Sequence, residues 1–196
     1  MTSILKADNI QDADGNNIIN ESSNTITIGA SGDTTNVIGT LNKDGVAVAN
    51  TPYFYGELAA AQTITRGTAT KITGMTNDEQ DSATAFDGTT FTVPSGQGGR
   101  YYIEGVVTAA YGDIGQDGEE TVAYIYKGGS EIKQATIRTS SSVTGTGRTI
   151  TTVASGIFNL SASDTIELYA TITDASGGNG NAAANRTSIA GYKLIE

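Results

Sequence analysis

The sequence contains no cysteine, no histidine and no tryptophan among its 196 residues. Without cysteine, disulfides and thiolate chemistry are absent, and without histidine the usual general base of nucleophile triads is missing. Paired carboxylates remain available for hydrolysis. A glycosidase would be expected to surround them with sugar-stacking aromatic rings, but the tyrosines of this chain fall within predicted strands. The composition therefore predicts a protein that is not an enzyme.

Basic residues are scarce, with 11 Lys and Arg against 21 Asp and Glu, which gives a net charge of −10. Phosphate binding needs a basic stripe, so a nucleic-acid partner is disfavoured. Long apolar runs are also missing, and a membrane-spanning helix needs about 18 consecutive apolar residues, so we expect no membrane insertion. The start of the chain, MTSILKADNIQDADG, turns polar early and does not resemble a signal peptide.

Glycine is abundant, at 25 residues, and the stretch at residues 86–109 shows how it is used. Phe91 and Val93 alternate with polar residues, Pro94 and a glycine cluster interrupt the run, and an apolar run resumes at Tyr101. Proline cannot donate to a strand ladder, so the interruption predicts a loop between two strands.

Further strands are predicted on both sides of this stretch. Gly128-Gly129 predicts a two-residue hairpin turn, and the SASD sequence at 161–164 predicts the closure of a second hairpin. Short strands at regular spacing with turn signals predict an all-β sandwich or jelly roll over residues 52–196. The predicted strands are residues 53–58, 122–126, 132–137, 150–160, 165–173 and 189–195.

Residues 1–50 differ from the rest and predict an N-terminal arm followed by a short β-rich stalk. The polar QDADGNN sequence predicts a tight turn, hence a small hairpin or a folded-back arm, and a calcium loop there would lack its later glutamate. The apolar residues around this turn are candidates for attachment to another protein: Ile4, Leu5, Ile10, Ile18 and Ile19.

A weak repeat of apolar pairs follows, at residues 26 and 28, 37 and 38, and 46 and 48. A short strand and turn cannot bury its apolar side alone, so three chains wound side by side would enclose a core. The alternative is a meander that packs on the following domain.

The longer loops at 112–120, 139–147 and 174–187 hold the remaining candidate sites. The carboxylates Asp113, Asp117, Glu119 and Glu120 could hold a calcium ion or could form a solvated acidic loop. Otherwise we expect no cofactor. The last loop could contact a receptor or a glycan, or it could be a permissive tip, and its candidate residues are Asp174, Asn179, Asn181 and Arg186.

Several of these sequences together resemble the C1q/TNF-like globular heads. The resemblance covers about residues 52–196, and it departs from the family at Ser163, where the family usually has glycine, and in the longer loop between Pro94 and Gly99. It implies a ten-stranded jelly roll that forms a homotrimer. The residues that carry it are 91–94, 99–103, 122–129, 158–160, 163–164, 166–168 and 189–194.

By this resemblance the candidate trimer interface residues are Tyr53, Tyr55, Tyr102, Tyr192 and Leu194, and some of them are alternatively ordinary core. The N-terminal sequence, residues 4–33, resembles the leaders of small structural proteins of tailed bacteriophages. This implies a virion surface protein, assembled in the host cytoplasm, with major capsid or tail proteins as partners.

Two functions follow as expectations. The first is a non-enzymatic, trimeric capsid decoration (cement) protein attached through its N-terminal arm, which is short compared with the shaft of a host-reaching fibre. The second is a tail-fibre or collar adhesin whose distal loops bind a receptor or carbohydrate on the host surface.

Overall fold

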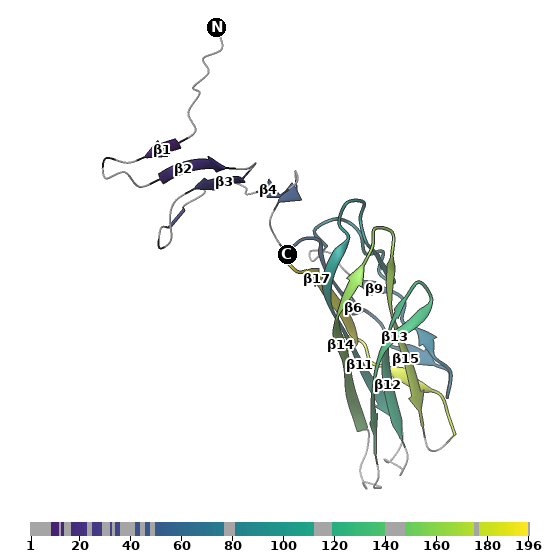
Figure 1. Ribbon diagram of the computed structural model, residues 1–196. Helices are drawn as coiled ribbons and strands as arrows, with labels where there is room; N and C mark the ends of the chain where they lie inside the picture. Colours follow the sequence, from purple (N-terminus) through teal and green to yellow (C-terminus); the bar gives the residue numbers. More distant parts are fainter. Residues whose placement is uncertain are drawn as a thin grey trace. The chain divides into compact units, whose positions relative to one another are not determined.

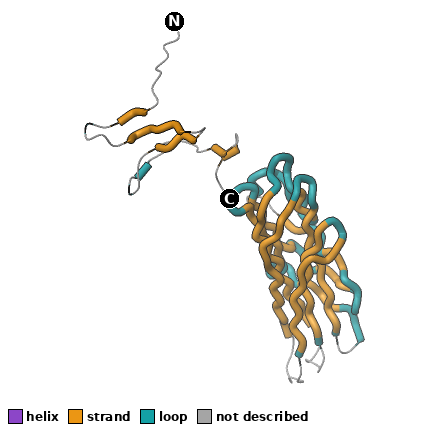
Figure 2. Tube along the Cα trace, viewed as in Figure 1, coloured by secondary structure: helices purple, strands orange, loops and turns teal. Residues whose placement is uncertain are grey.

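The computed structural model describes residues 9–11, 13, 17–22, 25–28, 32, 34–35, 42–43, 46–47, 50–76, 81–111, 119–139, 148–174 and 177–195. The chain divides into two compact units, Met1–Val48 and Ala49–Glu196. The described residues form strands and loops and include no helix (Figure 2). In this part of the chain there is accordingly no helix with the length and hydropathy needed to cross a bilayer.

The N-terminal unit contains a three-stranded antiparallel sheet in the order β1-β2-β3, formed by Asn9–Gln11, Asn17–Ser22 and Thr25–Ile28. The hairpin expected in the first 24 residues is confirmed by the β1–β2 ladder. A second pair, β4 (Asn42–Lys43) and β5 (Val46–Ala47), follows. Ile4, Leu5, Val37 and Ile38 lie outside the described residues, and so does the side chain of Ile18.

The second unit, which we call the head, contains two antiparallel sheets (Figure 1). The large sheet has seven strands, in the order β7-β16-β11-β17-β6-β9, with β14 on the other side of β11. Its strands are β6 (Tyr53–Leu58), β7 (Gln62–Ile64), β9 (Met75–Thr76), β11 (Gly99–Tyr111), β14 (Arg148–Leu160), β16 (Gly180–Ala182) and β17 (Ser188–Lys193).

The small sheet has five strands, in the order β10-β15-β12-β13, with β8 paired to β15. The Gly128-Gly129 turn joins β12 to β13, and both glycines have positive φ, as a type I′ hairpin turn requires. The strands of this sheet are β8 (Thr70–Lys71), β10 (Thr90–Thr92), β12 (Glu120–Lys127), β13 (Ser130–Arg138) and β15 (Thr165–Thr173).

The strand order is that of a jelly roll. The long strands divide into the quartets β6-β17-β11-β14 and β10-β15-β12-β13, so the first strand lies beside the last one and the chain crosses repeatedly between the sheets. The jelly-roll prediction is therefore confirmed. The resemblance implied ten strands. The described residues of the head form seven strands in the large sheet and five in the small sheet, because short strands extend both sheets.

The predicted hairpin of residues 150–160 and 165–173 is wrong in its pairing. Both strands exist, as β14 and β15, but β14 pairs with β11 in the large sheet and β15 pairs with β12 in the small sheet. The turn at 161–164 therefore connects the sheets, because a short turn is compatible with either a hairpin or a corner and apolar alternation does not identify the partner.

The core lies between the two sheets, and aromatic rings fill it near the stretch at residues 86–109. The Phe54 and Phe91 rings stack with centroids 4.1 Å apart, and Tyr101 lies 5.9 Å from Phe91. Gly191 makes room for them, since a Cβ there would lie 2.7 Å from the Phe54 ring. These inward-facing aromatic side chains are therefore packed against one another in the core.

Candidate functional site

The candidate site is the outward face of β6, β17, β11 and β14 in the large sheet. These four strands are neighbours, and residues paired directly across a ladder lie on the same face. One row across the sheet is Tyr53, Tyr192, Tyr102 and Ile157. The next row is Tyr55, Ala190, Glu104 and Ser155, and the third is Glu57, Ser188, Val106 and Val153.

Among the described residues of the head, this face contains most of the large apolar side chains that are exposed. The exposed fractions are 42% for Tyr53, 36% for Tyr55, 38% for Tyr192, 47% for Val153 and 61% for Ile157. The side chains on the solvated outer face of a sheet are normally polar. A contiguous exposed apolar face instead indicates a surface that contacts another protein.

Two tyrosine hydroxyls on the face are bonded within it. Tyr55 Oη donates to Glu57 Oε2 at 2.8 Å, and Tyr102 Oη donates to Glu104 Oε2 at 2.8 Å. The bond to the Glu104 carboxylate raises the pKa of Tyr102, and burial followed by the bond to Glu57 raises the pKa of Tyr55. These rings can therefore be covered by another protein without leaving a buried hydroxyl unpaired.

The four tyrosines expected at an interface thus lie together on one face, and the Tyr102 and Tyr192 rings contact each other at 5.6 Å. Leu194, the fifth expected residue, is half-exposed just after β17 and donates its backbone N–H to the Arg100 carbonyl. Sequence reasoning missed Val153 and Ile157. Apolar residues occupy both faces of β14, so the sequence did not show which of them face outward.

A second tyrosine cluster lies on the outward face of the small sheet. The Tyr126 and Tyr169 rings stack at 4.1 Å, and Tyr124 meets Tyr126 edge-on at 6.1 Å. Thr171 Oγ1 donates to Tyr124 Oη at 3.2 Å. All three rings are half-buried because they cover one another, so this cluster offers less apolar surface than the large sheet does.

One candidate residue of the expected ligand loop is buried, and two exposed ones bond to a neighbouring segment. Asp174 is buried, Asn179 Oδ1 accepts the Arg66 backbone N–H at 3.1 Å, and Asn181 Oδ1 accepts from Thr63 Oγ1 at 3.1 Å. Asp174 is therefore not available to a receptor or a glycan, and the two asparagine oxygens hold β16 beside β7. Arg186 is exposed, as expected.

The prediction of a solvated acidic loop is wrong for the two glutamates that the structure describes. Glu119 is completely buried, and Glu120 begins β12 and forms a salt bridge with Arg138. Burial, with nearby Glu119, Asp174 and Glu120, raises the pKa of Tyr111 to about 12. Asp113 and Asp117 lie outside the described residues, and among the residues that are described no group of three or more acidic side chains could hold a metal ion.

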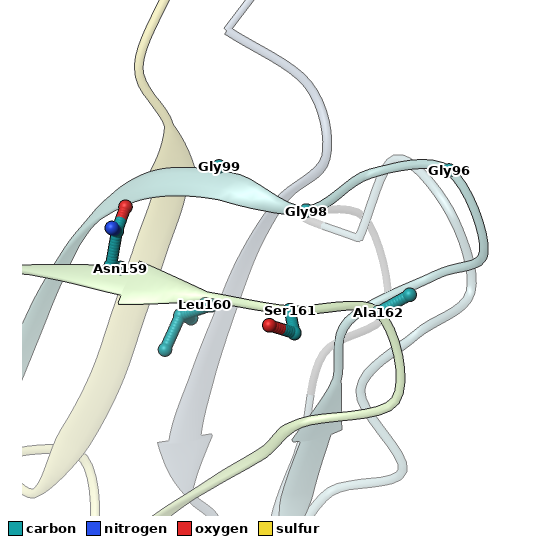
Figure 3. Close-up of a pocket in the computed structure, with 7 residues that line it drawn as sticks. All are labelled: Gly96, Gly98, Gly99, Asn159, Leu160, Ser161 and Ala162. Carbon is teal, nitrogen blue, oxygen red and sulfur yellow. The ribbon is translucent and has the colours of Figure 1, made fainter.

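A shallow groove lies between the loop after Pro94 and the turn after β14 (Figure 3). Glycine backbone forms one wall, and Gly98 is close enough to the turn that a Cβ would lie 3.3 Å from the Leu160 carbonyl oxygen. Asn159 and Ser161 supply the polar side chains of the lining. The longer loop noted in the sequence therefore packs against a neighbouring turn.

No family model matches the sequence, and no curated protein matches it. A solved structure, the globular domain of zebrafish complement 1qA protein, is similar to this chain with a TM-score of 0.47 and 10% sequence identity. The similar region covers 73% of this chain and 97% of that one. At this level of similarity the fold assignment depends on the strand ladders, which define an all-β jelly-roll sandwich.

Proposed function

We propose that the protein is a non-enzymatic structural protein of a bacteriophage virion, a homotrimer that decorates the capsid surface and attaches through residues 1–50. The observation that supports the trimer is the exposed face of β6, β17, β11 and β14. Aromatic side chains bury about 150–250 Å² each, so the exposed fractions of the three tyrosines, together with those of Val153 and Ile157, leave several hundred Å² in contact with water. An exposed apolar patch of this size on a soluble protein is often functional.

A second copy of the chain is the proposed occupant of this face. Tyrosine is enriched in protein interfaces, and Tyr53, Tyr55 and Tyr192 supply the buried aromatic contacts that dominate binding energy. The charge of −10 per chain opposes association, and two carboxylates on the face are already bonded to tyrosine hydroxyls. Burial of apolar surface, worth about 25 cal/mol per Å², offsets that repulsion.

The N-terminal unit supports attachment to a further protein. Ile10, Ile19 and Ile28 are paired in one row across its three-stranded sheet, and they are exposed by 38%, 38% and 58%. A single-layer sheet with an exposed apolar row is not self-sufficient, because a sheet must bury its apolar face to be stable. The proposed partner is a major capsid protein, and the bacteriophage assignment is supported by the resemblance of the N-terminal sequence.

A tail-fibre or collar adhesin is the second candidate. The observation that favours it is that four strands of the head, β11 to β14, have an end on the same side of the sandwich. Tyr111 at the end of β11 pairs with Arg148, and Glu120 at the start of β12 pairs with Arg138. Long connections that leave one end of a β-sandwich are common ligand-binding positions.

Deletion of residues 1–24 separates the two candidates. For a decoration protein we expect the variant to remain trimeric by light scattering but to lose incorporation into particles that lack the wild-type protein. An adhesin head would keep its binding to host cells after the same deletion. Retained incorporation would contradict attachment through the arm.

A further inference from the structure

The outward face of the large sheet has two parts of different chemistry. The aromatic patch consists of Tyr53 and Tyr55 on β6 and Tyr192 on β17. The aliphatic patch consists of Val153 and Ile157 on β14. Strands lie about 4.7–4.9 Å apart, so β14 is roughly 14 Å from β6 and roughly 10 Å from β17. Tyr102 and Glu104 on β11 lie between the two patches, and the Tyr102 ring contacts that of Tyr192 at 5.6 Å.

A closed ring of three identical chains needs two different patches on each chain, because each copy meets one neighbour with one surface and the other neighbour with another. A single self-complementary patch would give a twofold dimer instead. The aromatic and aliphatic patches are two such surfaces, and they lie on opposite sides of one face.

Charge favours contact between unlike patches. Glu57 lies two residues from Tyr55 on the same face, so pairing aromatic patch with aromatic patch would bring like charges together. No charged side chain occurs among the described side chains of β14, residues 149–160. Tyrosine also packs well against β-branched side chains, as Tyr102 does beside Ile157 within the sheet.

We propose that the aromatic patch of one copy packs on the aliphatic patch of the next copy, head to tail, and that three such contacts close the ring. This inference rests on the proposed trimer. It assigns Val153 and Ile157 the same importance for assembly as the tyrosines, although they lie on a different strand.

Mixing two disrupted variants tests the pairing. Tyr53→Asp/Tyr192→Asp removes the aromatic patch and Val153→Asp/Ile157→Asp removes the aliphatic patch, so each variant alone should be a monomer. An equimolar mixture retains one intact contact and should form a 1:1 heterodimer in sedimentation equilibrium. If the mixture stays monomeric while the wild-type protein is trimeric, the head-to-tail pairing is wrong and the proposed trimer stands. If the wild-type protein is itself monomeric, both proposals fail.

Ile137→Asp is the matched control, since Ile137 is 42% exposed but lies on β13 in the small sheet, and it should leave the trimer intact. Should the aspartate variants not fold, threonine at the same positions keeps strand propensity while removing apolar surface. Cysteine crosslinking gives a second measurement, because the chain has no other thiol. Tyr53→Cys/Val153→Cys treated with a short bismaleimide should give covalent trimers. Covalent dimers formed by Tyr53→Cys alone would overturn the pairing.

Discussion

The two faces of the large sheet both carry aromatic and aliphatic side chains, but they differ in exposure. On β6, Phe54 is 2% exposed, whereas its neighbours Tyr53 and Tyr55 are 42% and 36% exposed. The inward side chain is covered by Phe91 from the small sheet, whereas the outward ones stay partly exposed. One face therefore forms the core of the head, and the other remains partly exposed.

The outward face of the small sheet sharpens this contrast. Its three tyrosines contact one another, and Lys71 forms an ion pair with Glu167 at 2.6 Å beside them. Aromatic residues on an outward face therefore do not indicate an interface by themselves. The large sheet differs because its tyrosines share the face with exposed aliphatic residues.

The largest effect is expected on the inward face. Phe54→Ala should destabilise the head by about 3–5 kcal/mol, since it leaves a cavity between Phe91 and Phe86. Urea unfolding followed by circular dichroism measures the loss. A change under about 1 kcal/mol would show that Phe54 is not part of a packed core.

On the outward face, Tyr192→Asp should abolish assembly while leaving the unfolding of the head nearly unchanged, because Tyr192 packs on a neighbouring tyrosine and not in the core. Light scattering gives the mass, and denaturation at a concentration where both proteins are monomeric gives the stability. An intact trimer for this variant would contradict the assignment of the face.

Tyrosine titration separates the faces in a single experiment. Burial raises the pKa of Tyr101 to about 12, and that of inward-facing Tyr111 is raised to about 12 as well. The folded state thus retains these protons when an unfolded chain would lose them, so stability should be complete below pH 10 and should decline as the pH rises toward 12. Ultraviolet difference absorbance should show a late phase that Tyr101→Phe reduces. A single phase near pH 10 in the folded protein would contradict the burial of both rings.

The smallest effect is expected at Ser163, which has a φ of 70° in the turn after β14. A left-handed conformation costs a non-glycine residue about 1–2 kcal/mol, and the greater freedom of glycine in the unfolded chain offsets part of that gain. Ser163→Gly should therefore stabilise the head by up to about 1 kcal/mol, seen as a higher thermal midpoint. A lower midpoint would show that the serine side chain stabilises the turn.

Much of the head was predictable from local sequence. The break at Pro94, the Gly128-Gly129 turn and the β6 strand are all set by residue types that act within a few positions. Strand pairing was not predictable in the same way. The sequence of the turn at 161–164 is compatible with a hairpin or with a corner between two sheets. The pairing of β14 with β11 depends on contacts between residues far apart in the sequence.

The candidate site was predictable in part. The tyrosines at 53, 55, 102 and 192 are distributed over three strands. The family resemblance predicted all four as interface residues without the strand register. The aliphatic patch and the burial of Glu119 were not visible, because each depends on which face of a strand meets the opposite sheet.

The most direct test is the mass of the wild-type chain in solution at micromolar concentration, by size exclusion with light scattering. If three copies cover one another's exposed sheet faces, the mass will be three times 20.1 kDa. A folded species of 20.1 kDa would mean that the tyrosine face stays in water, and the account would be contradicted.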